Sequence, residues 1–225
     1  MELAKVVPWG RSFEEYRAMF ALSEADLNRR ILGCADGPAS FNAEASDRGC
    51  QVISCDPVSQ FDVEEIRRRI DEVYPEIMDQ MQQRADDYLW DTPSSVEQLG
   101  EVRMKAMSSF LADFNAGLRK GRYVSASLPS LPFFDSEFEL AVCPHYLFLY
   151  SDHLDGPTHL ASVRELCRVA TEVRIFPVVS LDGKISKYLD SVMTALSADG
   201  VDVSLQRVSD RFQKGATEML VAKSE

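Results

Sequence analysis

Short runs of apolar and β-branched residues alternate along the chain with stretches of helical spacing, and this alternation most constrains the fold. Seven runs are typical of strands, at residues 30–34, 51–55, 122–126, 138–143, 172–177, 202–208 and 218–222. Between the first two runs, "PASFNAEASDRG" places Phe41 and Ala45 four residues apart and ends on a glycine, as a helix does. A strand, a helix and a strand in this order predict two parallel strands joined by a right-handed crossover.

Two later stretches, 157–170 and 185–198, also have helical spacing. The first carries Leu160, Val163 and Leu166 on one face, and the second carries apolar residues in the same way. We interpret both as helices that cover a sheet, which indicates an α/β protein of the doubly wound type.

The segment between the second and third strands is far longer than a single crossover needs. Apolar residues follow helical spacing over 63–81 and again over 96–118, and "DDYLWDTPSS" joins the two stretches, with Ser94 or Ser95 as the cap of the second helix. We therefore expect one domain over residues 1–225, with residues 58–121 as a helical insertion within it. Its apolar stripes indicate core packing, and its tip, with Tyr88 and Trp90, is a candidate roof for a ligand pocket.

The charge balance limits the partners of the chain. There are 24 Lys and Arg residues against 36 Asp and Glu residues, a net charge of -12 over 225 residues. Such a charge repels nucleic acid and anionic lipid surfaces. The most basic stretch, "RRRIDEV" at 67–73, has acidic residues around it, which favours a solvated face with ion pairs. We expect a small-molecule partner, no nucleic acid and no membrane.

The first residues, "MELAKVVPWGRSFEEYR", lack the pattern of a secretory signal, and no apolar run approaches the roughly 20 residues of a spanning helix. The five cysteines are odd in number and form no C-x-x-C pair, which favours a reduced, cytoplasmic protein. His145, His153 and His159 have spacings that match no common zinc pattern, so we expect no metal.

Residues that directly follow the strands are the candidates for ligand binding, because ligands of doubly wound sheets lie at the carboxyl ends of the strands. After the first strand, "GCADGPAS" offers small side chains and the free N–H groups of a helix N-terminus. After the second strand, Asp56 is suited to accept hydrogen bonds from a ribose diol, though an Asp there is also a common turn former.

Four segments resemble the successive motifs of class I S-adenosylmethionine (SAM)-dependent methyltransferases: "ILGCADGPASF", "VISCDP", "SLPSLPFFDSEFELAVCPHYLFLY" and "ELCRVATEVRIFP". The final "VDVSLQRV" and "EMLVAKS" resemble the hairpin that ends this family's sheet. The resemblance implies a Rossmann-like, mostly parallel sheet of seven strands with an antiparallel C-terminal hairpin, and methylation of a small molecule. The cofactor-binding residues that it implies are Gly33, Cys34, Ala35, Asp36, Gly37, Asp56, Pro57, Ser127, Leu128 and Cys143.

The chain departs from the family pattern in several places. The family's G-x-G-x-G falls on Ala35, Gly37 and Ala39, and its acidic residue before the loop, which reaches the methionine amino group, falls on Gly33. The acidic residue after the third strand, which faces the adenine, falls on Ser127. Asp36 is close enough in sequence to take over the ammonium contact.

His145 follows the fourth strand directly and is the candidate catalytic residue, as a general base near the methyl group. The alternative is a packing and hydrogen-bonding role beside the cofactor. The candidates for holding an apolar or aromatic acceptor are Tyr146, Phe148, Tyr150 and Trp90.

Two other functions fit the same features. One is a catalytically silent binding or regulatory protein that keeps the methyltransferase fold. The other is a nicotinamide-dependent oxidoreductase, since the loop and Asp56 also suit a dinucleotide, although the loop lacks the glycines that make room for a pyrophosphate.

Overall fold

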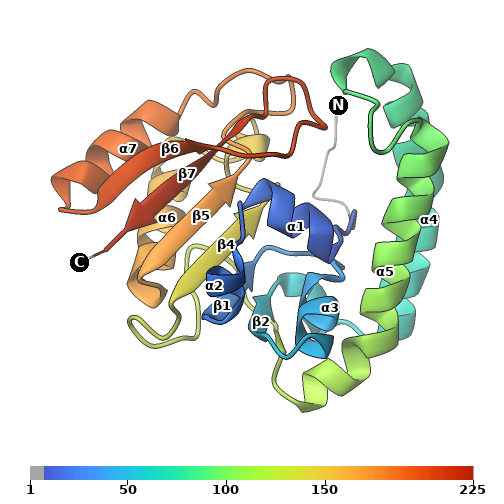
Figure 1. The fold of residues 1–225 in the computed structure, drawn as a ribbon, viewed down its shortest axis with the longest axis horizontal. Coiled ribbons are helices and arrows are strands. Elements are labelled where there is room, and N and C mark those ends of the chain that lie inside the picture. The colour runs from blue at the N-terminus through green and yellow to red at the C-terminus, as the bar shows by residue number, and fades with distance from the viewer. Residues whose placement is uncertain (1–7, 225) are drawn as a thin grey trace.

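The structure, a computed structural model, describes residues 8–224 and is built on one seven-stranded sheet (Figure 1). The order of the strands is β3-β2-β1-β4-β5-β7-β6. Their bounds are β1 (Arg30–Cys34), β2 (Gln51–Cys55), β3 (Tyr123–Val124), β4 (Leu140–Pro144), β5 (Glu172–Phe176), β6 (Asp202–Arg207) and β7 (Glu218–Lys223).

The first five strands pair in parallel, and β7 runs antiparallel to both β5 and β6. The predicted α/β fold class, with its antiparallel C-terminal hairpin, is therefore confirmed. The chain passes from β1 to β2 on one side and returns to β4 on the other, so the strand order reverses between β1 and β4. In sheets of this kind the crevice at this reversal is the usual ligand site.

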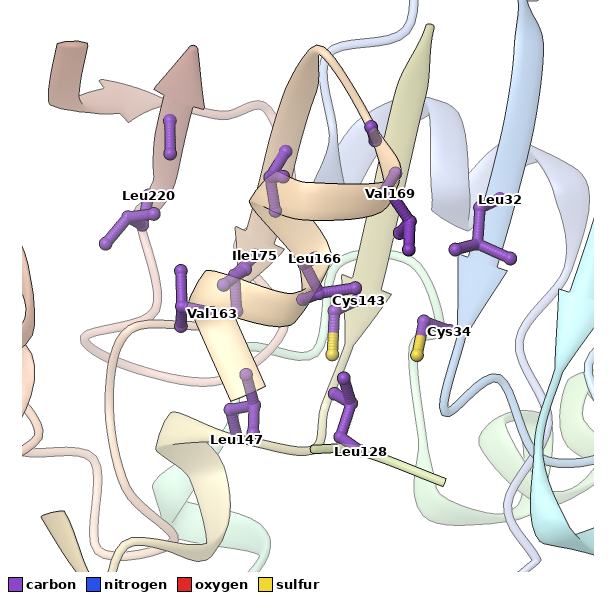
Figure 2. Packing of buried hydrophobic residues seen from close by; sticks show 14 of the residues in the cluster. Leu32, Cys34, Leu128, Cys143, Leu147, Val163, Leu166, Val169, Ile175 and Leu220 are labelled. Atoms are coloured by element: carbon purple, nitrogen blue, oxygen red, sulfur yellow. The ribbon is translucent and has the colours of Figure 1, made fainter. Parts of the chain in front are cut away.

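Helices cover both faces of the sheet. On one face, α6 (Gly156–Val169) and α7 (Leu189–Ala198) bury Val163, Leu166 and Leu196 against the strands. Figure 2 shows Val163 and Leu166 of α6 beside Cys143 and Ile175 of the sheet. The other face is covered by three helices, α1 (Phe13–Met19), α2 (Glu24–Leu27) and α3 (Phe41–Asp47).

Several predicted boundaries were wrong, and three of them have a clear cause in the structure. The third strand is limited to two residues because it lies at the sheet edge and pairs only with the end of β2. The fourth begins at Leu140, since Phe138 makes only an isolated bridge to Ala170. Helix α7 begins at Leu189 because Ile185 and Ser186 are instead bonded back to the loop after β5.

The segment between β2 and β3 forms a long antiparallel pair of helices, α4 (Val63–Gln83) and α5 (Val96–Arg119), beside α3 (Figure 1). Asp62 caps α4, and Ser95, one of the two predicted cap residues, caps α5. Apolar stripes of both helices meet in two clusters, as their spacing predicted. Short 3-10 helices, η1 (Pro57–Gln60) and η2 (Ala85–Asp87), lie at the two ends of α4.

The tip of this helical pair is joined to the loop between β6 and β7, and we call this contact the clasp (residues 87–90 with 212–214). The Tyr88 ring stacks on Phe212 with 4.8 Å between centroids, and Trp90 meets the same ring edge-on. Leu89 N donates to Phe212 O at 2.8 Å, and Lys214 N donates to Asp87 O at 3.0 Å. The helical pair thereby spans the carboxyl ends of the strands. Within residues 8–224, no helix is long and apolar enough to cross a membrane.

Candidate functional site

A cavity of about 770 Å³ lies at the carboxyl ends of the strands, where the strand order reverses. Its floor comes from the loops after β1, β2, β3 and β4. Its walls come from residues 8–11, α4, the clasp and the segments at 149–150 and 181. Of the residues predicted from the sequence, those that line it are Cys34, Ala35, Asp36, Gly37, Asp56, Pro57, Ser127, Leu128, His145, Tyr146 and Tyr150.

The loop after β1 turns through two left-handed residues, Ala35 (φ 61°) and Gly37 (φ 57°). Ala35 N donates to Cys55 O at 2.9 Å, which ties the loop to the end of β2. A side chain at position 37 would meet open space, so glycine is needed there for its left-handed backbone and not for lack of room. The loop therefore keeps a left-handed turn even though an alanine stands at position 35.

Asp36 is almost fully buried, at 8% exposure, and its carboxylate lies under the loop at the cavity wall. Tyr16 Oη donates to its Oδ1 at 2.8 Å, and Ser54 Oγ donates to its Oδ2 at 2.6 Å. Burial raises its pKa to about 7, against the opposing effect of these hydrogen bonds. A side chain on Gly33 would collide with the carboxylate, so the glycine of β1 makes room for the acid three residues later.

Asp56, at the end of β2, accepts two backbone hydrogen bonds with its carboxylate. Val58 N donates to Oδ1 at 2.7 Å and Gly37 N to Oδ2 at 2.9 Å, so the side chain connects the loops after β1 and β2. Burial raises its pKa above the ordinary range. Because each carboxylate oxygen can accept two hydrogen bonds, Asp56 keeps capacity for a ligand.

The end of the cavity beyond Asp56 has largely apolar walls. Ala126, Ser127 and Leu128 follow β3 there, and Pro57 and Val58 of η1 lie on the same side. This end suits a flat, weakly polar ring.

His145 follows β4 with an unusual backbone. It takes the left-handed conformation at φ 46°, where its N–H donates to Phe176 O at 2.7 Å. Its Nδ1 is buried and finds no hydrogen-bond partner among residues 8–224. Burial, and next the positive charges of Arg11 and Arg103, lower its pKa well below the ordinary value, so the imidazole is neutral at pH 7. A strained residue with an unsatisfied ring nitrogen is a marker of function.

Aromatic and aliphatic side chains form the wall beyond His145. Tyr146 and Tyr150 lie with their ring centroids 6.5 Å apart, and Leu149 and Leu181 line the cavity next to them. Met81, Tyr88 and Phe212 come from α4 and the clasp. This half of the cavity suits an organic molecule with an apolar body.

Four sequence-predicted site residues do not line the cavity. Cys143 and Phe148 are both fully buried in the core beneath α6, where each packs as a hydrophobe. Trp90 turns back on its own loop, and its Nε1 donates to Ala85 O at 2.8 Å. Gly33 contributes space for Asp36 and no surface of its own.

Arg11 lines the cavity but was missed by sequence reasoning. It precedes α1, in a part of the chain outside the family resemblance, and no spacing marks it as a site residue. Its place depends on contacts with the loop after β1, where Ser40 N donates to Arg11 O at 3.0 Å.

Over residues 8–224, no group of three or more His, Cys, Asp or Glu side chains is arranged to hold a metal.

Comparison with known proteins gives one sequence relative and several similar structures. An uncharacterised protein of Methanocaldococcus jannaschii is 28% identical over 228 residues, covering 99% of this chain and 98% of its own. No family model matches the sequence.

Among solved structures, magnesium protoporphyrin IX methyltransferase from Synechocystis PCC 6803, with bound SAM, superimposes with a TM-score of 0.50 at 13% identity. The match covers 95% of this chain and 78% of the enzyme. A protein from Pyrococcus horikoshii OT3 gives a TM-score of 0.51 at 10% identity, over 94% of this chain and 90% of that one. The chain thus has the Rossmann-like fold that class I SAM-dependent methyltransferases share.

Proposed function

We propose that this chain binds SAM in the cavity and transfers its methyl group to a small organic molecule. The observation that carries the proposal is a pair of carboxylates, the buried Asp36 and the half-buried Asp56, at the ends of β1 and β2 in one cavity. The shared fold supports it, since a ligand of this cavity lies at the strand-order reversal.

The residues present fit the three polar parts of the cofactor. In this proposal Asp36 holds the ammonium group, Asp56 accepts from the ribose diol, and the wall at Ser127 and Leu128 packs against adenine. The departure at position 33 is offset, because the carboxylate that the family carries there is supplied by Asp36 over the same strand.

Methyl transfer requires little acid–base catalysis from the protein. When bound, SAM supplies a methyl group on a sulfonium, which is already electrophilic. The cavity walls hold the acceptor in line and exclude water, which accounts for much of the rate in reactions of this kind. In this proposal His145, whose imidazole is neutral and whose side chain lines the cavity, accepts a proton from the acceptor.

A second candidate is a binding protein that keeps the fold without catalysis. It is favoured by Ser127, which leaves the adenine end without the acidic residue expected from the family pattern. This candidate shares the cofactor site and differs only in the fate of the methyl group.

Calorimetric titration with SAM, S-adenosylhomocysteine (SAH) and NAD in parallel tests the binding step. We expect SAM and SAH to bind and NAD not to bind; binding of NAD alone, or of none of the three, contradicts the proposal. Incubation with methyl-deuterated SAM and a small-molecule extract, followed by mass spectrometry, then separates the two candidates. A new labelled product indicates an enzyme, and unchanged SAM with tight binding indicates the silent protein.

A further inference from the structure

Arg11 presents a cationic side chain to the cavity. Its backbone is fixed by Ser40 N, and Gly10 beside it approaches the Pro38 carbonyl more closely than any side chain would allow. Its guanidinium carries five donors, of which Nη1 donates to Trp9 O at 2.9 Å; no other hydrogen bond of this group is found within residues 8–224. Donors therefore remain for a ligand.

The acids near Arg11 do not occupy these donors. Glu15 forms an ion pair with Arg11, but its Oε1 lies 3.9 Å from Arg11 Nε, too far for a hydrogen bond. The Glu15 carboxylate also accepts from Ser12 and pairs with Arg103. Asp210 acts on Arg11 only through space, as no ion pair joins them among the described residues.

Arg103 adds a second positive charge behind Arg11. It is 2% exposed, and its Nε has no hydrogen-bond partner in the described part of the chain. Burial, and next the charge of Arg103, lower the pKa of Arg11 to about 10. Its guanidinium stays charged at pH 7, so the site holds a desolvated cation that an anion would stabilise.

The surroundings of Arg11 indicate what else the anion carries. The charge of Arg11 acts on three cavity-lining side chains, His145 and Tyr150 after β4 and Tyr88 of the clasp. It also acts on Tyr16, which donates to Asp36. An anionic group at Arg11 would thus have its organic body against Tyr146, Tyr150 and Leu149, beside His145.

We infer that the acceptor is an organic acid whose carboxylate binds the Arg11 guanidinium while its apolar body packs on the tyrosine wall. Planar, forked pairing makes arginine well suited to a carboxylate. The inference rests on the proposed function in so far as it calls the bound acid a methyl acceptor. The carboxylate site itself does not depend on that function. The amino-acid part of SAM also carries a carboxylate, so the test must separate these two sources.

The test uses benzoate and phenylacetate with their uncharged amides, benzamide and phenylacetamide, titrated into the SAH-loaded protein. We expect each carboxylate to bind at least about tenfold more tightly than its amide, because a charge-assisted pair is lost in the amide. Arg11→Gln should abolish this preference and Arg11→Lys should keep part of it. Arg67→Gln, which removes the same charge from an exposed site on α4, should leave it unchanged.

SAH and 5′-methylthioadenosine, which lacks the amino-acid part, distinguish the two carboxylates. If Arg11→Gln loses affinity for SAH and not for 5′-methylthioadenosine, Arg11 holds the cofactor and the inference is overturned. It is also overturned if the wild type shows no preference for the acids, or if Arg11→Gln retains it. If SAH does not bind at all, the proposed function fails, and the same titrations of the ligand-free protein still decide whether Arg11 binds a carboxylate.

Discussion

One side chain, Asp36, joins three elements of the fold at the place where the cofactor is proposed to bind. Its carboxylate accepts hydrogen bonds from the hydroxyls of Tyr16 in α1 and Ser54 in β2, and it lies over Gly33 of β1. Burial raises its pKa to about 7. The folded protein therefore keeps this carboxyl protonated at pH values where the unfolded chain has already lost the proton.

Asp36→Asn should therefore flatten the pH dependence of stability. The folded state binds more protons than the unfolded state between about pH 4 and 7, so wild-type stability falls as the pH rises through this window. The asparagine variant lacks this pH-dependent contribution to the free energy of unfolding, which amounts to roughly 4 kcal/mol over the whole pH window. Chemical denaturation at pH 4.5 and 7.5 measures it, with exposed Asp47→Asn on α3 as the control. Parallel pH profiles of wild type and Asp36→Asn would contradict the prediction.

Asp56 has two roles: its carboxylate accepts hydrogen bonds from the backbone of Gly37 and Val58, and we propose that it also binds the ribose. A single substitution can affect both roles. Asp56→Asn keeps an acceptor for the backbone and removes the charge. We expect SAH affinity to fall by about 2 kcal/mol or more, as charge-assisted hydrogen bonds are lost. The loss should be smaller for the 2′-deoxy analogue of SAH. Equal losses for both ligands, measured by calorimetry, would assign Asp56 to the loops alone.

At the scale of elements, the helical pair α4 and α5 reaches across the sheet and is held at its far end by the clasp. The contacts there are aromatic and backbone contacts between segments about 120 residues apart. Met81, Tyr88 and Phe212 line the cavity at this point, so opening the clasp would open the acceptor half.

Phe212→Ala should loosen the clasp without unfolding the sheet. Removing the ring deletes its stacking on Tyr88 and its edge contact with Trp90, interactions worth about 1 kcal/mol beyond their buried area. Hydrogen exchange at Leu89 and Lys214, whose N–H groups bond across the clasp, should speed up roughly tenfold while β4 keeps its protection. Phe134→Ala removes a ring that is 82% exposed and serves as the control. Unchanged exchange at both amides would show that the backbone bonds hold the clasp unaided.

Over the whole molecule, acidic groups outnumber basic ones and give the net charge of -12. The basic stretch of α4 is laced with ion pairs, Arg67 with Glu64 and Arg69 with Glu72, as its sequence predicted. Three arginines line the cavity: Arg11, which we infer to bind the carboxylate of the acceptor, and Arg68 and Arg69 of α4. A cation confined to a cavity can select an anionic small molecule while the surface repels a polyanion.

A gel-shift assay tests this reading of the charge. At about 50 mM salt, where electrostatic binding is strongest, micromolar protein should retain neither DNA nor RNA. Retention that weakens steeply with salt would return nucleic-acid modification to consideration, and a protein of opposite net charge run alongside shows that the assay detects binding.

Local patterns of the sequence determined the strands, the covering helices α3, α6 and α7, and the two helices between residues 58 and 121, whereas α1 and α2 were not predicted. The bounds of β1 and β2 agree with the sequence prediction to the residue, because alternation and turn residues act over a few positions. Asp56 was predictable for the same reason, as a residue at a strand end is fixed by its own strand. The description of the chain as one domain with an insertion stays a prediction.

Only the tertiary structure decided which side chains meet in the cavity. Asp36 turns inward because Tyr16, 20 residues earlier, and Ser54, 18 residues later, both donate to it. Arg11 reaches the cavity because the segment before α1 packs on the loop after β1. Trp90 lies outside the cavity because its indole N–H donates to a carbonyl of its own loop. These choices depend on contacts between distant segments, and such contacts leave no period or spacing in the sequence.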